Sequence, residues 1–95
     1  MKGETKDGFK FEINEKGLDD FRFVTGYRKI VKAESDNPES GVQIMEDYMK
    51  LINLFMDDEQ VDSLADQIAE KEGGVPFARM TEVISEIIGI AKGKN

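Results

Sequence analysis

Residues 42–56 read VQIMEDYMKLINLFM, and this stretch decides the fold because most of its side chains are apolar. On a helix that turns about 100° per residue, the apolar side chains cover roughly 220° of the surface. A helix that only covers a core needs an apolar stripe of a little over ~100°. We therefore expect helix 42–56 to be either the central element of its domain or an interface with another chain.

Three further helices are expected from the spacing of apolar residues. The first begins at Asp19-Asp20, and the others cover about 58–72, ending at Gly73-Gly74, and about 77–92. The last helix carries apolar residues over an arc of about 160°, which is again wider than one core requires. A weak turn capped by Asn14 precedes the first helix, and residues 34–41 form a polar loop. In the first helix we expect one shared apolar face, made of Phe23, Val24, Tyr27, Ile30 and Val31.

The N-terminal residues predict a β-hairpin. Asp7-Gly8 is a two-residue turn signal, and Phe9, Phe11 and Ile13 alternate with charged residues as in a strand with one buried face. The preceding segment, 2–6, is short and polar and should form an edge strand. The predicted fold class is therefore α+β in a single domain, 1–95. In it, a hairpin (1–13) packs on a small bundle of about four helices (14–92) and a short tail (93–95) follows.

Composition narrows the function classes. The 95 residues are 39% hydrophobic and carry a net charge of −7, which is typical of one folded domain. This charge repels nucleic-acid phosphates and anionic lipid surfaces. The chain has no cysteine, which fits a reducing cytoplasm, and no run of ~18 apolar residues that could span a membrane. We expect a cytoplasmic protein that binds neither nucleic acid nor membrane.

The residues needed for most enzyme chemistry are missing. With no histidine and no cysteine, the commonest acid–base residue, the commonest soft nucleophile and the usual ligands of zinc and iron–sulfur clusters are absent. No glycine-rich phosphate loop is present, and the carboxylate clusters lack the spacing of a calcium loop. The sequence therefore predicts no enzyme, no catalytic residue, no cofactor and no metal.

One tripeptide offers an alternative function. Asp62-Ser63-Leu64 matches the residues around the modified serine of acyl carrier proteins, in which the serine begins a helix. Here Ser63 falls inside a predicted helix, which favours an ordinary surface serine. A carrier protein modified at Ser63 stays an alternative, as does a small dimeric regulatory protein that uses an apolar helix as its interface.

The order of motifs along nearly the whole chain resembles the tail assembly chaperones of long-tailed bacteriophages and prophages of Gram-positive bacteria. The resemblance begins with residues 6–14, KDGFKFEIN, and an aspartate pair that opens a helix. Asn37-Pro38 in a loop, an acidic helix start at 58–60 and Gly74-Val75-Pro76 before the final helix follow. The chain departs from this pattern where Phe21-Arg22-Phe23 and Gly26-Tyr27 replace a more acidic, leucine-rich helix.

This resemblance implies a non-enzymatic role in tail morphogenesis. Such chaperones hold the long, helical, apolar tape measure protein, help to recruit tail tube subunits around it, self-associate and are absent from the mature virion. The expected partners are thus the tape measure protein, the tail tube protein and further copies of the chain, in the cytoplasm of the bacterial host.

The two helices with surplus apolar surface supply the expected interface. An acidic surface should favour partner segments with basic flanks. Among the candidates, the arc-edge residues Ile44, Leu51, Leu54, Ile88 and Ile90 should be the most exposed. The partner or oligomer interface candidates are Ile44, Met45, Met49, Leu51, Leu54, Ile84, Ile88 and Ile90.

Overall fold

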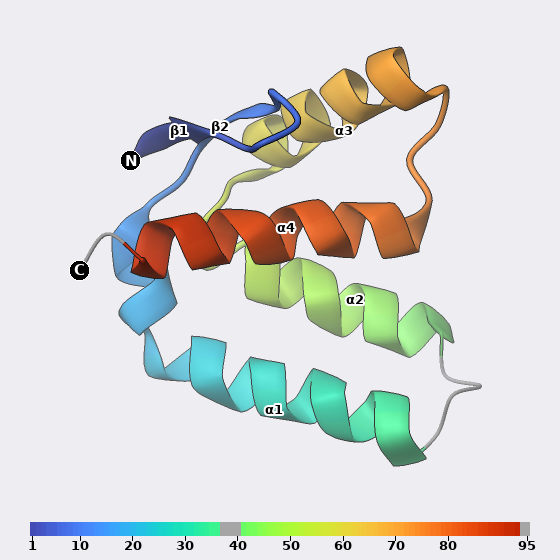
Figure 1. Ribbon diagram of the computed structural model, residues 1–95. Helices are drawn as coiled ribbons and strands as arrows, with labels where there is room; N and C mark the ends of the chain where they lie inside the picture. Colours follow the sequence, from blue (N-terminus) through green and yellow to red (C-terminus); the bar gives the residue numbers. More distant parts are fainter. Residues whose placement is uncertain (37–40, 94–95) are drawn as a thin grey trace. The chain divides into compact units, whose positions relative to one another are not determined.

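The structure, a computed structural model, describes residues 1–36 and 41–93, with side chains described for 1–32 and 43–93. It is an α+β chain with an N-terminal antiparallel hairpin followed by helices (Figure 1). The chain divides into two compact units, Met1–Ile13 with Asp58–Asn95, and Asn14–Asp57. That both units form one domain stays a prediction. The elements in chain order are β1 (Lys2–Glu4), β2 (Lys10–Glu12), the 3₁₀ helix η1 (Glu15–Asp19), α1 (Phe21–Asp36), α2 (Gly41–Ile52), α3 (Asp58–Glu72) and α4 (Phe77–Lys92).

The hairpin of the first unit forms as predicted, with one difference at its turn. The backbone N–H of Thr5 donates to Phe9 O and that of Gly8 donates to Thr5 O, each over 2.9 Å, so three residues rather than two form the loop. Gly8 has φ +90°, which a three-residue loop requires at its last position and which glycine adopts without strain. The predicted alternation is confirmed, because Phe9, Phe11 and Ile13 are buried while the charged residues between them are exposed.

Helix α3 holds the open edge of β2 through one side chain. The Gln67 amide donates to Lys10 O over 2.8 Å, and its oxygen accepts the Lys10 N–H over 2.7 Å, as a neighbouring strand would. Val61, Leu64 and Ile68 form the buried face of α3, and the helix ends at Gly73, which has φ +84°. Two acidic residues in the first turn of α3 favour its N-terminus electrostatically.

In the second unit, Asn14 and Asp20 set the entry into the helices. The Asn14 side chain accepts the Lys16 N–H over 3.2 Å and begins η1, as predicted. Asp20 accepts the Arg22 N–H over 2.9 Å, and α1 begins at the residue after it. Helix α1 continues to Asp36 and α2 begins at Gly41, so the prediction of a loop was wrong for residues 34–36 and 41. Residues 37–40 of that predicted loop lie outside the described part.

Helix α2 ends four residues earlier than the 42–56 stretch predicts. It ends at Ile52, and residues 53–56 form a turn in which Leu54 and Phe55 donate their N–H groups three residues back. The turn points Phe55 and Met56 into the core, where each is 2% exposed. The arc of 220° is therefore too wide, because three of its apolar residues, Leu54, Phe55 and Met56, belong to the turn.

That turn also closes the second unit on itself. The Asn14 N–H donates to Phe55 O over 2.7 Å. Gly17 lies against the same turn, so that a Cβ there would collide with the Leu54 carbonyl and lie 2.8 Å from Phe55 Cα. A residue with a side chain could not allow this approach without moving the backbone.

Candidate interaction surface

Helix α1 exposes an apolar stripe. Its members recur at steps of three and four residues, are 45% to 78% exposed, and are Phe21, Val24, Tyr27 and Val31, here called the α1 stripe. Residues at this spacing lie on one face of a helix. The stripe extends over about 15 Å, at 1.5 Å per residue. Contiguous exposed apolar surface of this kind marks interaction sites.

The core contacts of α1 explain why the stripe stays outside. Phe23 and Ile30 are buried, and the Phe23 ring packs edge-on against Phe55 with centroids 5.9 Å apart. Gly26 faces α2, where an added Cβ would lie 3.2 Å from Leu51 Cδ1. Among the side chains that the structure describes in α1, residues 21–32, the inward face thus consists of these three residues. The prediction of one shared apolar face was wrong for Val24, Tyr27 and Val31, which are exposed and lie roughly 40–100° away from the buried Phe23 around the helix.

The side chains around the stripe are basic. Residues 21–32 contain four basic residues and no acidic one. Two of them are neutralised within the unit, since Arg22 binds Asp20 over 2.7 Å and Lys29 approaches Asp47 over 3.6 Å. Arg28 and Lys32, one turn apart and both exposed, have no acidic partner within 4.0 Å among the described side chains. Two positive charges therefore run along one edge of the stripe.

Helix α2 contributes two further exposed apolar side chains in the same unit. Met45 is 44% exposed and Met49, one turn later, is 38% exposed. Ile44 and Leu51 are buried, so the expectation that they are exposed arc-edge residues was wrong, because this edge of α2 faces the core rather than solvent. Leu54 is half-buried and lines a shallow hollow between α1 and α2 with Lys29 and Lys50.

The candidates on α4 are less exposed than expected. Ile84 is buried, and Ile88 and Ile90 are half-buried. The whole set of eight candidates therefore does not form one exposed surface. Their role in binding or self-association stays a prediction.

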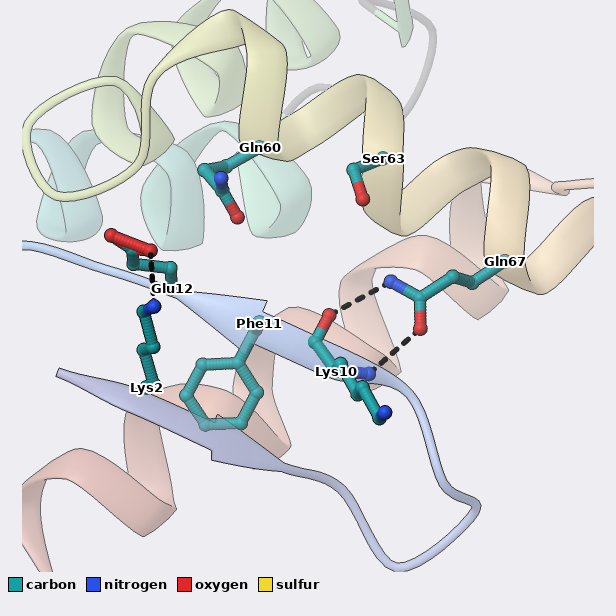
Figure 2. A pocket seen from close by; sticks show the side chains of 7 residues that line it. All are labelled: Lys2, Lys10, Phe11, Glu12, Gln60, Ser63 and Gln67. Atoms are coloured by element: carbon teal, nitrogen blue, oxygen red, sulfur yellow. Dashed lines mark hydrogen bonds and ion pairs between the residues drawn. The ribbon is translucent and has the colours of Figure 1, made fainter.

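Ser63 lies on α3 in the other unit, at a shallow hollow of about 340 Å³ between that helix and β2 (Figure 2). Its hydroxyl points toward the hairpin, next to Gln60 and Gln67. The sequence predicts that Ser63 lies inside a helix. In the structure it is the sixth residue of α3, so it does not begin the helix. Lys2 and Glu12 form a 3.9 Å ion pair at the rim, with both side chains more than half exposed.

Arg79 organises the electrostatics of the first unit. Its guanidinium lies 2.9 Å from Asp7, 2.8 Å from Glu72 and 3.5 Å from Glu82, and joins the hairpin turn to the end of α3. Its hydrogen bonds lower the pKa of the Asp7 and Glu72 carboxyls, and the two carboxylates raise the pKa of Arg79. In the second unit, the hydrogen bonds of Arg22 lower the pKa of Asp20 to about 2. The Arg79 ion pairs thus link the hairpin turn, α3 and α4, and the Arg22 pair lies at the start of α1.

The described residues contain neither a group of side chains placed to hold a metal ion nor a helix that could cross a membrane. No group of three or more acidic side chains in residues 1–36 and 41–93 is placed to hold a metal ion. In the same part of the chain, no helix is long and apolar enough to cross a membrane.

The charges of residues 21–32 also indicate the α1 surface, which the apolar pattern alone does not reveal. Residues 21–32 contain no acidic residue, although the chain has a net charge of −7. These residues coincide with the segment in which the sequence departs from the chaperone pattern. Comparisons of the chain with protein-family models, with curated proteins and with solved structures return no match.

Proposed function

We propose that this chain is a non-catalytic assembly chaperone of phage tails, which holds a helical segment of the tape measure protein while tail tube subunits are recruited. The observation that carries the proposal is the α1 stripe, with Tyr27 55% exposed at its centre. A helix partner uses anchors at i, i+3 and i+7, which is the spacing of Val24, Tyr27 and Val31. The proposal places the chain in the host cytoplasm and outside the mature virion.

Self-association is part of this proposal, as is the single helical bundle predicted from the sequence. Met45 and Met49 support self-association, because methionine adapts to differently shaped partners and both side chains are exposed on one face of α2. Homo-oligomers would let several copies line one long tape measure helix, and repeated weak contacts add up along it.

The proposal is tested by co-expression with a tape measure protein, whose gene the proposal expects to lie beside the gene of this chain. The chain should co-purify with helical fragments of that protein. The carrier alternative predicts instead an intact mass raised by a phosphopantetheine arm, and loss of that mass in Ser63→Ala. A dimeric regulator would self-associate and leave the tape measure fragments unbound.

A further inference from the structure

We infer that the α1 stripe takes an amphipathic helix whose flanking residues are acidic. This inference rests on the proposed binding role and names the chemistry of the partner segment. It reverses the expectation from the net charge, which favours partners with basic flanks. The reversal follows from where the charges lie on α1.

The local charge of α1 is opposite to that of the chain. The four basic residues of 21–32 are included in the total of −7, so the rest of the chain carries −11. Arg28 and Lys32 adjoin the stripe, lying about 40° and 80° beyond Val24 around the helix. Neither has an acidic neighbour in ion-pair distance among the described side chains. Carboxylates on a bound helix could approach both cations without displacing an internal ion pair.

The shape of the stripe fits a helix of a protein. The stripe extends over about three helical turns and covers an arc of about 120°, within which Val24, Tyr27 and Val31 occupy about 60°. An apolar seam of this length matches the contact between two packed helices. A helix that lies in a membrane surface presents a broad apolar face instead, and the acidic remainder of the chain would be repelled by anionic lipid.

A second copy of α1 is a poor occupant for the same reason of charge. Two α1 helices in contact would bring Arg28 and Lys32 of each copy toward the same residues of the other. Like charges in register at a helix contact are destabilising. The partner segment therefore differs from α1 in the sign of its flanking charges.

The test uses the full chain and two synthetic 21-residue helical peptides. Both peptides carry leucine at i, i+3, i+7 and i+10, and their flanks are glutamate in one and lysine in the other. We expect the glutamate peptide to bind about tenfold more tightly at low salt, because two rim pairs change from attraction to repulsion. Chemical shift changes in NMR spectra should concentrate on residues 21–32.

A charge-reversal variant and a matched control sharpen this test. Arg28→Glu/Lys32→Glu should invert the preference, so that the lysine peptide binds more tightly. Lys16→Glu/Lys50→Glu makes the same change in net charge at exposed positions outside the stripe and should keep the original preference. Circular dichroism of both variants should match the original chain, because all four side chains are exposed.

Several results would overturn the inference. The first is that both peptides bind equally tightly. The second is that both double variants change the preference for the glutamate peptide in the same way. The third is that the NMR chemical shift changes lie outside α1. Vesicles of phosphatidylserine and phosphatidylcholine test the lipid alternative, and sedimentation tests a second copy. If the chain ignored both peptides but bound vesicles or itself through α1, the inference would be wrong. A chain that retains tape measure fragments but ignores the glutamate peptide would keep the proposed function and lose this inference.

Discussion

At the scale of single residues, replacing Gly17 and Gly89 by alanine should change the stability in opposite directions, because an added Cβ collides with backbone at Gly17 and meets open space at Gly89. Gly17→Ala should lower the free energy of unfolding by about 2 kcal/mol or more, because the new Cβ collides with the turn at Leu54. Gly89→Ala, in helix α4 with no atom within 4 Å of the added Cβ, should raise it by about 0.5–1 kcal/mol. Urea unfolding of both variants checks the pair, and equal effects would contradict the close approach at Gly17.

The lowered pKa values of single carboxyl groups lead to a prediction of how the stability of the fold depends on pH. The pKa of Asp20 is lowered from 3.8 to about 2, and the pKa values of Asp7 and Glu72 are lowered from 3.8 and 4.5. A carboxyl with a lowered folded pKa stabilises the fold above its unfolded pKa and loses this contribution as the pH falls through the folded value. Thermal midpoints should therefore fall as the pH is lowered from about 4.5 toward 2.

The partner of two of these carboxyls provides the control. In Arg79→Met the cause of the Asp7 and Glu72 shifts is gone, so the fall in midpoint over that range should be smaller than in the original chain. Identical pH profiles would show that Arg79 does not link the hairpin turn to α3 in solution.

At the scale of elements, the attachment of β2 to α3 depends on one side chain. Gln67→Leu removes both hydrogen bonds to the Lys10 backbone and should cost about 0.5–1.5 kcal/mol of stability, because both bonds are exposed and water can replace the lost partner. Hydrogen exchange at the Lys10 amide should accelerate. Ser63→Ala, one turn earlier on the same helix, should change neither quantity, and a similar acceleration there would argue against the attachment.

The elements also show how far the sequence could predict this structure. The hairpin, the ends of α3 and the start of η1 follow from local chemistry at Gly8, Gly73 and Asn14, and periodicity places all the helices. Periodicity could not reveal which apolar residues of a helix face the core. Tyr27 and Phe23 have similar side chains, and their rings stack with centroids 6.4 Å apart. Phe23 is buried against Phe55, a tertiary contact that periodicity does not contain, whereas Tyr27 is 55% exposed.

The two faces of α1 should respond differently to substitution. Ile30→Ala removes a buried side chain and should lower the free energy of unfolding by about 2–4 kcal/mol. Val31→Ser, at the next residue but on the exposed stripe, should change it by no more than about 0.5 kcal/mol. Thermal or urea unfolding of the pair distinguishes the faces, and a large loss in Val31→Ser would place this residue in the core.

At the scale of the whole molecule, the net charge and the local charge of α1 point to different partners. The net charge of −7 opposes the approach of polyanions. The basic, apolar surface of α1 is where an acidic helix could still approach. Net charge alone could not predict this, because it averages over residues that the fold places on different surfaces.

Binding of the tape measure protein by α1 is the central claim, and one measurement tests it most directly. The affinity for a tape measure fragment is compared between the original chain, Val24→Ser/Tyr27→Ser and Ser63→Ala, all confirmed as folded by circular dichroism. We predict that the stripe variant binds at least about tenfold more weakly, because two half-exposed side chains lose apolar contact. Ser63→Ala should bind as the original chain does. Unchanged binding by the stripe variant, or loss of binding in Ser63→Ala alone, would contradict the claim.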